Sequence, residues 1–103
     1  MPERTDHPTA DEALRRARTD QPIRESLLWI ATRLDARRPY HYMTPDGRTA
    51  IALTAATTAH PADDAAAEEL ERQLLLRMPT VAKGTTRGDY AETLRRAAGK
   101  GGA

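Results

Sequence analysis

The sequence has 103 residues, of which 30% are charged and 39% apolar, and a formal net charge of +1. This length favours one domain with a modest core, and the lack of cysteine excludes disulfides, thiolate metal sites and cysteine nucleophiles. No apolar run approaches membrane-spanning length and no apolar signal region opens the sequence, so we expect a cytoplasmic protein.

Two helices are predicted in the first third of the sequence. Thr9 and Glu12 have the spacing of a capping box, which predicts a short helix ending near Arg18. Pro22 suits the first turn of a second helix, which should end before Pro39. The apolar stripe of the second helix has helical spacing and consists of Ile23, Leu27, Ile30 and Leu34.

The segment Pro39–Leu53 predicts a β-hairpin. Tyr40 and Tyr42 before the turn, and Ile51 and Leu53 after it, recur at period two and are types that suit a pleated surface. The intervening loop contains proline, aspartate and glycine, which favour a tight turn. The alternation leaves open which face is buried, and we favour burial of the two tyrosines.

A helix is the alternative interpretation of the same segment. Thr44 could cap a helix that has Pro45 at its first position. Gly47 would then be an early helical glycine, and Ile51 and Leu53 would lie on different faces. The period-two pattern favours the hairpin over this helix.

Two further helices follow. One should begin at His60–Asp64 and run to about Met78, with an apolar band that broadens towards its end. A short final helix should be capped near Thr86 and end at Gly99. The predicted fold class is therefore α+β, a single domain over residues 9–99 between a disordered segment at 1–8 and a flexible tail at 100–103.

Charge is unevenly distributed along the sequence. Residues 40–76 have a net charge of −4, whereas residues 77–103 have a net charge of +4. The basic residues indicate a nucleic acid as the alternative partner. The candidate contacts are Arg48, Arg87, Arg95 and Arg96. Overall neutrality argues against a dedicated nucleic-acid binder, because such proteins usually have a high pI.

The run RRPYHYMTPDGRTAI, at residues 37–51, resembles the segment that closes the wing in MarR- and PadR-type regulators. In those families a strand precedes Thr-Pro-Glu/Asp-Gly-Arg, which opens a helix. The predicted hairpin, which follows a helix and has Arg48 at its tip, is also similar to a DNA-binding wing. The families also have a strand before the wing tip, where this sequence has its clearest helical pattern.

Catalytic and metal-binding patterns are weak. His41, His60, Asp63 and Asp64 are possible ligand types, but their spacing matches no recognised metal site. Ser26, the single serine, lies inside a predicted helix rather than at a nucleophile elbow. We therefore expect no enzyme activity, no metal and no cofactor.

The surplus of apolar residues predicts a small regulatory or accessory protein that acts through protein–protein contact and self-associates. Leu28 and Trp29 lie on opposite sides of the main stripe of their helix. Either the first helix or the C-terminal segment covers Trp29, which is the favoured interpretation, or Trp29 anchors an interface, where tryptophan is enriched. The candidate partner interface consists of Trp29, Leu28, Leu75, Leu76, Tyr40 and Tyr42. Its partner would be another protein or a second copy of the chain.

Overall fold

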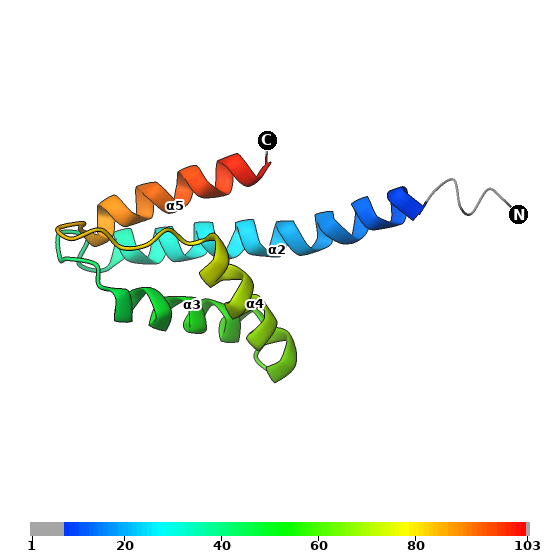
Figure 1. The fold of residues 1–103 in the computed structure, drawn as a ribbon. Helices are drawn as coiled ribbons and strands as arrows, with labels where there is room; N and C mark the ends of the chain where they lie inside the picture. The colour runs from blue at the N-terminus through cyan, green and yellow to red at the C-terminus, as the bar shows by residue number, and fades with distance from the viewer. Residues whose placement is uncertain (1–7, 103) are drawn as a thin grey trace, which may run out of the picture.

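The structure is a computed structural model that describes the backbone of residues 8–102 and the side chains of residues 22–99. The described chain is all-α and contains no strand, so the predicted α+β class is wrong. The segment predicted to be disordered lies outside these residues except for Pro8, whereas residues 100–102 of the predicted tail belong to the last helix. Figure 1 shows the four helices, which are α2 (Pro8–Ala36), α3 (Pro45–Ala59), α4 (Asp64–Arg77) and α5 (Arg87–Gly102).

The two predicted N-terminal helices are one continuous helix. Pro22 lies inside α2 instead of opening a second helix. A proline in a helix interior is costly, because its missing N–H removes one hydrogen bond and its ring crowds the preceding turn. Here the apolar stripe that follows Pro22 is held in the core, and α2 packs most extensively against α5. Figure 1 shows the N-terminal part of α2 extending beyond the end of α5.

The predicted hairpin is replaced by a turn and helix α3. The Thr44 hydroxyl accepts a hydrogen bond from the Gly47 N–H at 2.9 Å, and Pro45 stands at the first helical position. An N-cap threonine followed by proline starts a helix, because both residues suit a terminus whose first N–H groups have no backbone partner. The helix that opens at this motif in the regulators named above is therefore present, whereas a two-stranded wing is not found in the described chain.

Tyr42 pairs with a segment distant in the sequence. Its bridge partner is Thr86, in an isolated antiparallel pairing. The Met43 N–H donates to the Thr85 carbonyl at 2.8 Å, and the Arg87 N–H donates to the His41 carbonyl at 2.7 Å. These bonds join the loop after α2 to the loop before α5 at one end of the molecule.

The core lies between α2 and the three other helices. The stripe predicted on α2 is confirmed, since all four of its side chains are buried. Helix α3 contributes the small residues Ala52, Ala55 and Ala56, which allow α2 and α4 to approach it closely. No helix in the described part of the chain has the length and apolar character needed to cross a membrane.

Candidate interaction surfaces

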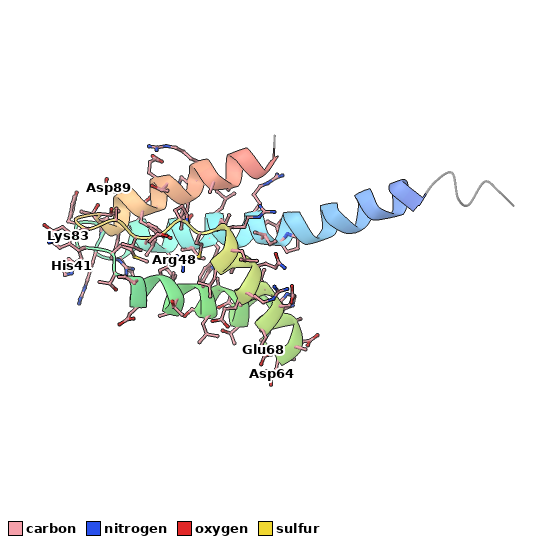
Figure 2. All side chains as sticks on the ribbon, in the orientation of Figure 1. His41, Arg48, Asp64, Glu68, Lys83 and Asp89 are labelled. Atoms are coloured by element: carbon pink, nitrogen blue, oxygen red, sulfur yellow. The ribbon has the colours of Figure 1, made fainter. Side chains whose placement is uncertain are left out.

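Arg48 is a structural residue at the meeting point of three elements. Its guanidinium donates to the Leu75 carbonyl at 2.6 Å, the Met78 carbonyl at 2.7 Å and the Pro79 carbonyl at 3.1 Å. A cation that satisfies the last carbonyls of a helix also interacts favourably with its dipole. Arg48 thus joins α3 to the end of α4, and Figure 2 shows it between these helices instead of at a hairpin tip.

Tyr90, on α5, binds the same loop carbonyl as Arg48. Its buried hydroxyl donates to the same Pro79 carbonyl at 2.5 Å. Burial raises the pKa of the Tyr90 phenol, and the nearby Arg48 charge opposes that rise only in part. No local sequence pattern identifies this hydrogen bond, because the carbonyl that accepts it lies in a loop 11 residues before Tyr90.

The outer side of α2 presents an apolar surface that we call the Trp29 face. It flanks the buried stripe: Leu28 is 41% exposed, and Trp29 is half-buried and packs partly against the core. Two surface hollows of about 340 and 420 Å³ meet at Trp29, one of them extending to the end of α3. The face consists of Pro22, Glu25, Leu28, Trp29, Thr32, Arg33 and Ala36.

Opposite charges flank Trp29 along this face. Glu25 lies four residues before it and Arg33 four residues after it. The Arg33 guanidinium also lies over the indole ring, 5.2 Å from its centroid, which is a cation–π geometry. The face therefore has an apolar centre, an acidic side and a basic side.

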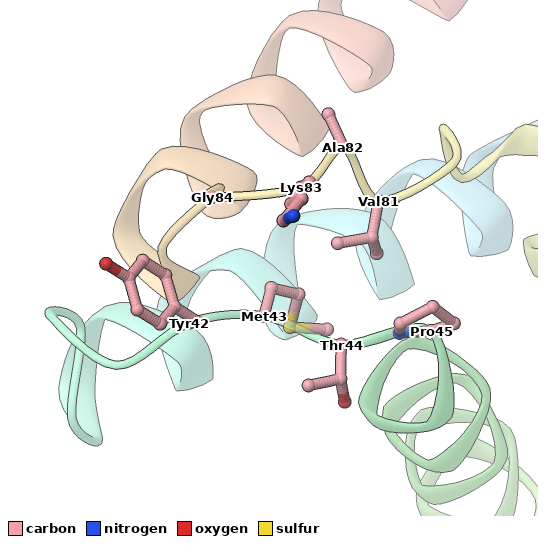
Figure 3. Close-up of a pocket in the computed structure, with 8 residues that line it drawn as sticks. All are labelled: Tyr42, Met43, Thr44, Pro45, Val81, Ala82, Lys83 and Gly84. Carbon is pink, nitrogen blue, oxygen red and sulfur yellow. The ribbon is translucent and has the colours of Figure 1, made fainter.

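A second surface lies at the end of the molecule where the two loops meet. A groove of about 580 Å³ runs between residues 42–45 and residues 81–84. Figure 3 shows Tyr42 on the segment 42–45 and Lys83 on the facing segment 81–84, with the side chains of Met43 and Val81 in the space between the two segments. Met43 is buried and Val81 half-buried, so the floor of the groove is apolar.

The two predicted hairpin tyrosines project into solvent beside this groove. Tyr40 is 88% exposed and Tyr42 is 71% exposed, so the expectation that they face the core is wrong. The predicted alternation is not found, because Tyr40, His41 and Tyr42 are all exposed and the side chain that turns inward is Met43. A methionine fills the small irregular gap between the loops more readily than a rigid phenol.

The remaining predicted contact residues are scattered. Leu76 is 70% exposed on α4, whereas Leu75 packs partly against the core. Arg95 forms ion pairs with Asp35 and Glu92, and the hydrogen bond that it donates to Asp35 raises the pKa of its guanidinium. Arg96 is exposed on α5. The basic residues of α5 therefore do not form one surface with Arg48.

Within the described residues, no three side chains of the histidine, aspartate or glutamate type come together where they could hold a metal ion. Ser26 is buried in α2 beside the Trp29 face. Comparisons with protein-family models, with curated proteins and with solved structures gave no match. The surfaces themselves are thus the basis for a functional proposal.

Proposed function

We propose that this protein acts through protein–protein contact and pairs with a second copy of itself across the Trp29 face. The observation that supports the proposal most is the arrangement of Glu25 and Arg33 at equal distances on either side of Trp29. Two copies of a helix related by a two-fold axis run antiparallel when the axis is perpendicular to them, and each contact then occurs twice. With the axis at Trp29, Glu25 of one copy lies opposite the partner's Arg33.

The apolar centre of the face suits the same arrangement. Trp29 and Leu28 would meet their counterparts near the axis, where burial of apolar surface stabilises association. Tryptophan and arginine are among the residue types most enriched at interface hot spots. The cation–π contact between Arg33 and Trp29 holds the arginine on the face, so less side-chain freedom is lost when the partner binds.

A cytoplasmic setting is part of this proposal. A secreted domain of this size usually depends on disulfides, and the sequence contains no cysteine. Inside the cell, a second copy of the chain would instead cover the apolar part of the Trp29 face.

The proposal is tested by measuring association with sedimentation velocity. Leu28→Glu places a charge at the centre of the interface and should weaken dimerisation by about 30-fold or more, corresponding to about 2 kcal/mol or more. Its side chain is already partly exposed, so the variant should remain folded by circular dichroism. Leu53→Glu, on the exposed side of α3, is the matched control and should dimerise like the natural protein.

The location of the interface is tested with Leu76→Glu. This leucine is the most exposed one on α4 and does not belong to the Trp29 face. We expect the variant to remain dimeric. A monomeric Leu76→Glu variant together with a dimeric Leu28→Glu variant would move the interface to α4 and contradict the proposal.

A further inference from the structure

We propose that the loop end of the molecule binds single-stranded nucleic acid. The site, which we call the loop platform, consists of Arg38, Tyr40, Tyr42, Lys83 and Arg87. It is separate from the Trp29 face and does not depend on dimerisation. This part of the molecule contains two exposed aromatic rings, three cations and an apolar groove, and together they support the proposal.

The tyrosines supply the stacking surfaces. Both rings are more than two-thirds exposed, although a monomer gains stability by covering aromatic surface. The backbone on either side of each ring is hydrogen-bonded. Around Tyr42, the His41 carbonyl accepts from the Arg87 N–H and the Met43 N–H donates to the Thr85 carbonyl. Around Tyr40, the Pro39 carbonyl accepts from the Gly88 N–H and the His41 N–H donates to the Arg38 carbonyl. Rings presented on a fixed backbone can stack on unpaired bases, and such stacking tolerates any base.

The cations supply contacts for phosphates. Among the described residues no ion pair joins Arg38, Lys83 or Arg87 to an acid. The Arg87 Nε donates to the Arg37 carbonyl at 2.9 Å, which holds its guanidinium beside the end of α2. Asp35, Asp46 and Asp89 are acids near the site. Asp35 is paired with Arg95, and Asp46 and Asp89 each occupy the first turn of a helix, where they compensate the positive end of the dipole.

The charges at the opposite end of the molecule favour one orientation of a polyanion. Asp64 and Glu68 lie on the first part of α4, and Figure 2 shows them far from His41 and Lys83. A nucleic acid is therefore attracted to the loop end and repelled from the start of α4. The net charge of the chain, which is only +1, conceals this local contrast.

Arg38 provides an independent observation. Its φ of +51° is in the left-handed region, and it is the one described non-glycine residue with a positive φ. The place just after a helix usually holds glycine, which adopts this conformation without strain. An arginine at such a place costs backbone strain that glycine would avoid, which is consistent with a role for its side chain in the site.

The groove favours single-stranded over double-stranded nucleic acid. Its volume of about 580 Å³ accommodates one base, and its walls carry an aromatic ring on one side and an ammonium group on the other. A base in the groove next to Tyr42 places its phosphate within the range of Lys83. Bases in a duplex are already stacked and cannot enter, so duplex DNA would contact only the cations.

The test is fluorescence anisotropy at about 50 mM salt with labelled oligothymidylate and oligouridylate of about 12 nucleotides and a duplex of equal length. We expect either single strand to bind about tenfold or more tightly than the duplex, with affinity falling as salt rises. The stronger of the two single strands identifies DNA or RNA as the natural class. Absence of binding at low salt, or equal binding of the duplex, would overturn the proposal.

Variants separate stacking from charge. Tyr40→Ala/Tyr42→Ala should weaken binding by about tenfold or more, whereas Tyr40→Phe/Tyr42→Phe should retain it, because phenylalanine keeps the ring. Equal loss in both double variants would contradict stacking. Equally tight binding of a polyglutamate peptide would show a general polyanion site and overturn the assignment to nucleic acid.

Arg38→Gly separates function from stability. The variant should lose affinity for the single strand while its thermal midpoint stays equal or rises, because glycine relieves the left-handed strain. Arg24→Ala is the matched charge control. It removes one arginine about 20 Å along α2 from the platform and should bind normally. Equal losses in the two variants would show that the platform is not the site.

Discussion

At the residue scale, Arg48 illustrates how a surface-type residue can become structural. An arginine beside a glycine in a turn-like run is easily taken for an exposed tip. In the structure its three donors meet carbonyls at the end of α4 and in the following loop. The sequence contains no local signal for this role, because the acceptors are about 30 residues away.

We predict that Arg48→Ala lowers the free energy of unfolding by about 2–3 kcal/mol, since charged hydrogen bonds are lost and carbonyls are left without donors. Arg48→Lys should recover only part of the loss, because an ammonium group cannot reproduce the planar fork. Urea denaturation followed by circular dichroism measures both variants. An Arg48→Ala variant as stable as the natural protein would contradict the structural role.

Tyr90 gives a prediction for alkaline pH. Its pKa is raised in the folded state by burial, so the folded chain holds the phenolic proton more tightly than the unfolded chain does. Its contribution to stability is therefore fully present below about pH 10, the ordinary pKa of tyrosine. The contribution is lost as pH rises from there through the folded pKa.

We expect the urea midpoint of the natural protein to fall more between pH 8 and alkaline pH than that of Tyr90→Phe, which has no proton to lose. Tyr40→Phe, which removes an exposed phenol, is the control and should retain the decline. If Tyr90→Phe and the natural protein decline in parallel, the buried phenol does not contribute to the pH dependence.

At the element scale, α2 and α3 show what sequence patterns can and cannot decide. The helical stripe from Ile23 to Leu34 was a reliable signal, because a buried helix face must repeat at this spacing. The Tyr40–Leu53 pattern misled because its spacing does not reflect alternation between two faces of a strand. Tyr40, His41 and Tyr42 are all exposed, and Ile51 and Leu53 lie on helix α3.

The Thr44 cap explains why this segment forms a helix instead of a hairpin. A few residues of extended backbone gain little without a partner strand, and the partner of Tyr42 is a residue far along the sequence. A capped helix start is satisfied locally, by one hydroxyl and one proline. Local capping signals should therefore outweigh a short alternation when both occur in the same run.

We predict that Thr44→Ala destabilises the fold by about 1 kcal/mol, because the Gly47 N–H loses its acceptor. Thr49→Ala is the matched control within the same helix. The Thr49 hydroxyl donates only to the Pro45 carbonyl, one turn earlier in the same helix. Alanine at this position should therefore leave the stability of the fold unchanged or raise it slightly. Thermal unfolding compares the two, and equal midpoints would show that the cap is unimportant.

At the scale of the whole molecule, the candidate sites could be predicted only in part. The sequence placed Leu28 and Trp29 outside the main stripe. In the structure Leu28 is 41% exposed, whereas Trp29 is half-buried and packs partly against the core. The sequence does not show that Lys83 and Tyr42 line the same groove, because they belong to two loops that are separated by two helices. Contacts of this kind depend on the packing of the helices, which no local pattern encodes.

The central claim is the antiparallel pairing of two copies through Glu25 and Arg33. Glu25→Arg places like charges opposite each other in the dimer, and Arg33→Glu does the same with the opposite sign. Each variant alone should therefore dimerise about tenfold or more weakly, because two attractions become two repulsions worth about 1 kcal/mol each.

The decisive measurement is sedimentation velocity of the Glu25→Arg and Arg33→Glu variants mixed in equal amounts. If the helices pair about Trp29, the two substituted positions face each other in the mixed dimer and carry opposite charges. The second pair then joins the unchanged Arg33 of one variant to the unchanged Glu25 of the other, as in the natural dimer. We predict that each variant sediments as a monomer on its own and that the mixture sediments as a dimer. A mixture that remains monomeric, or variants that each dimerise like the natural protein, would contradict the pairing.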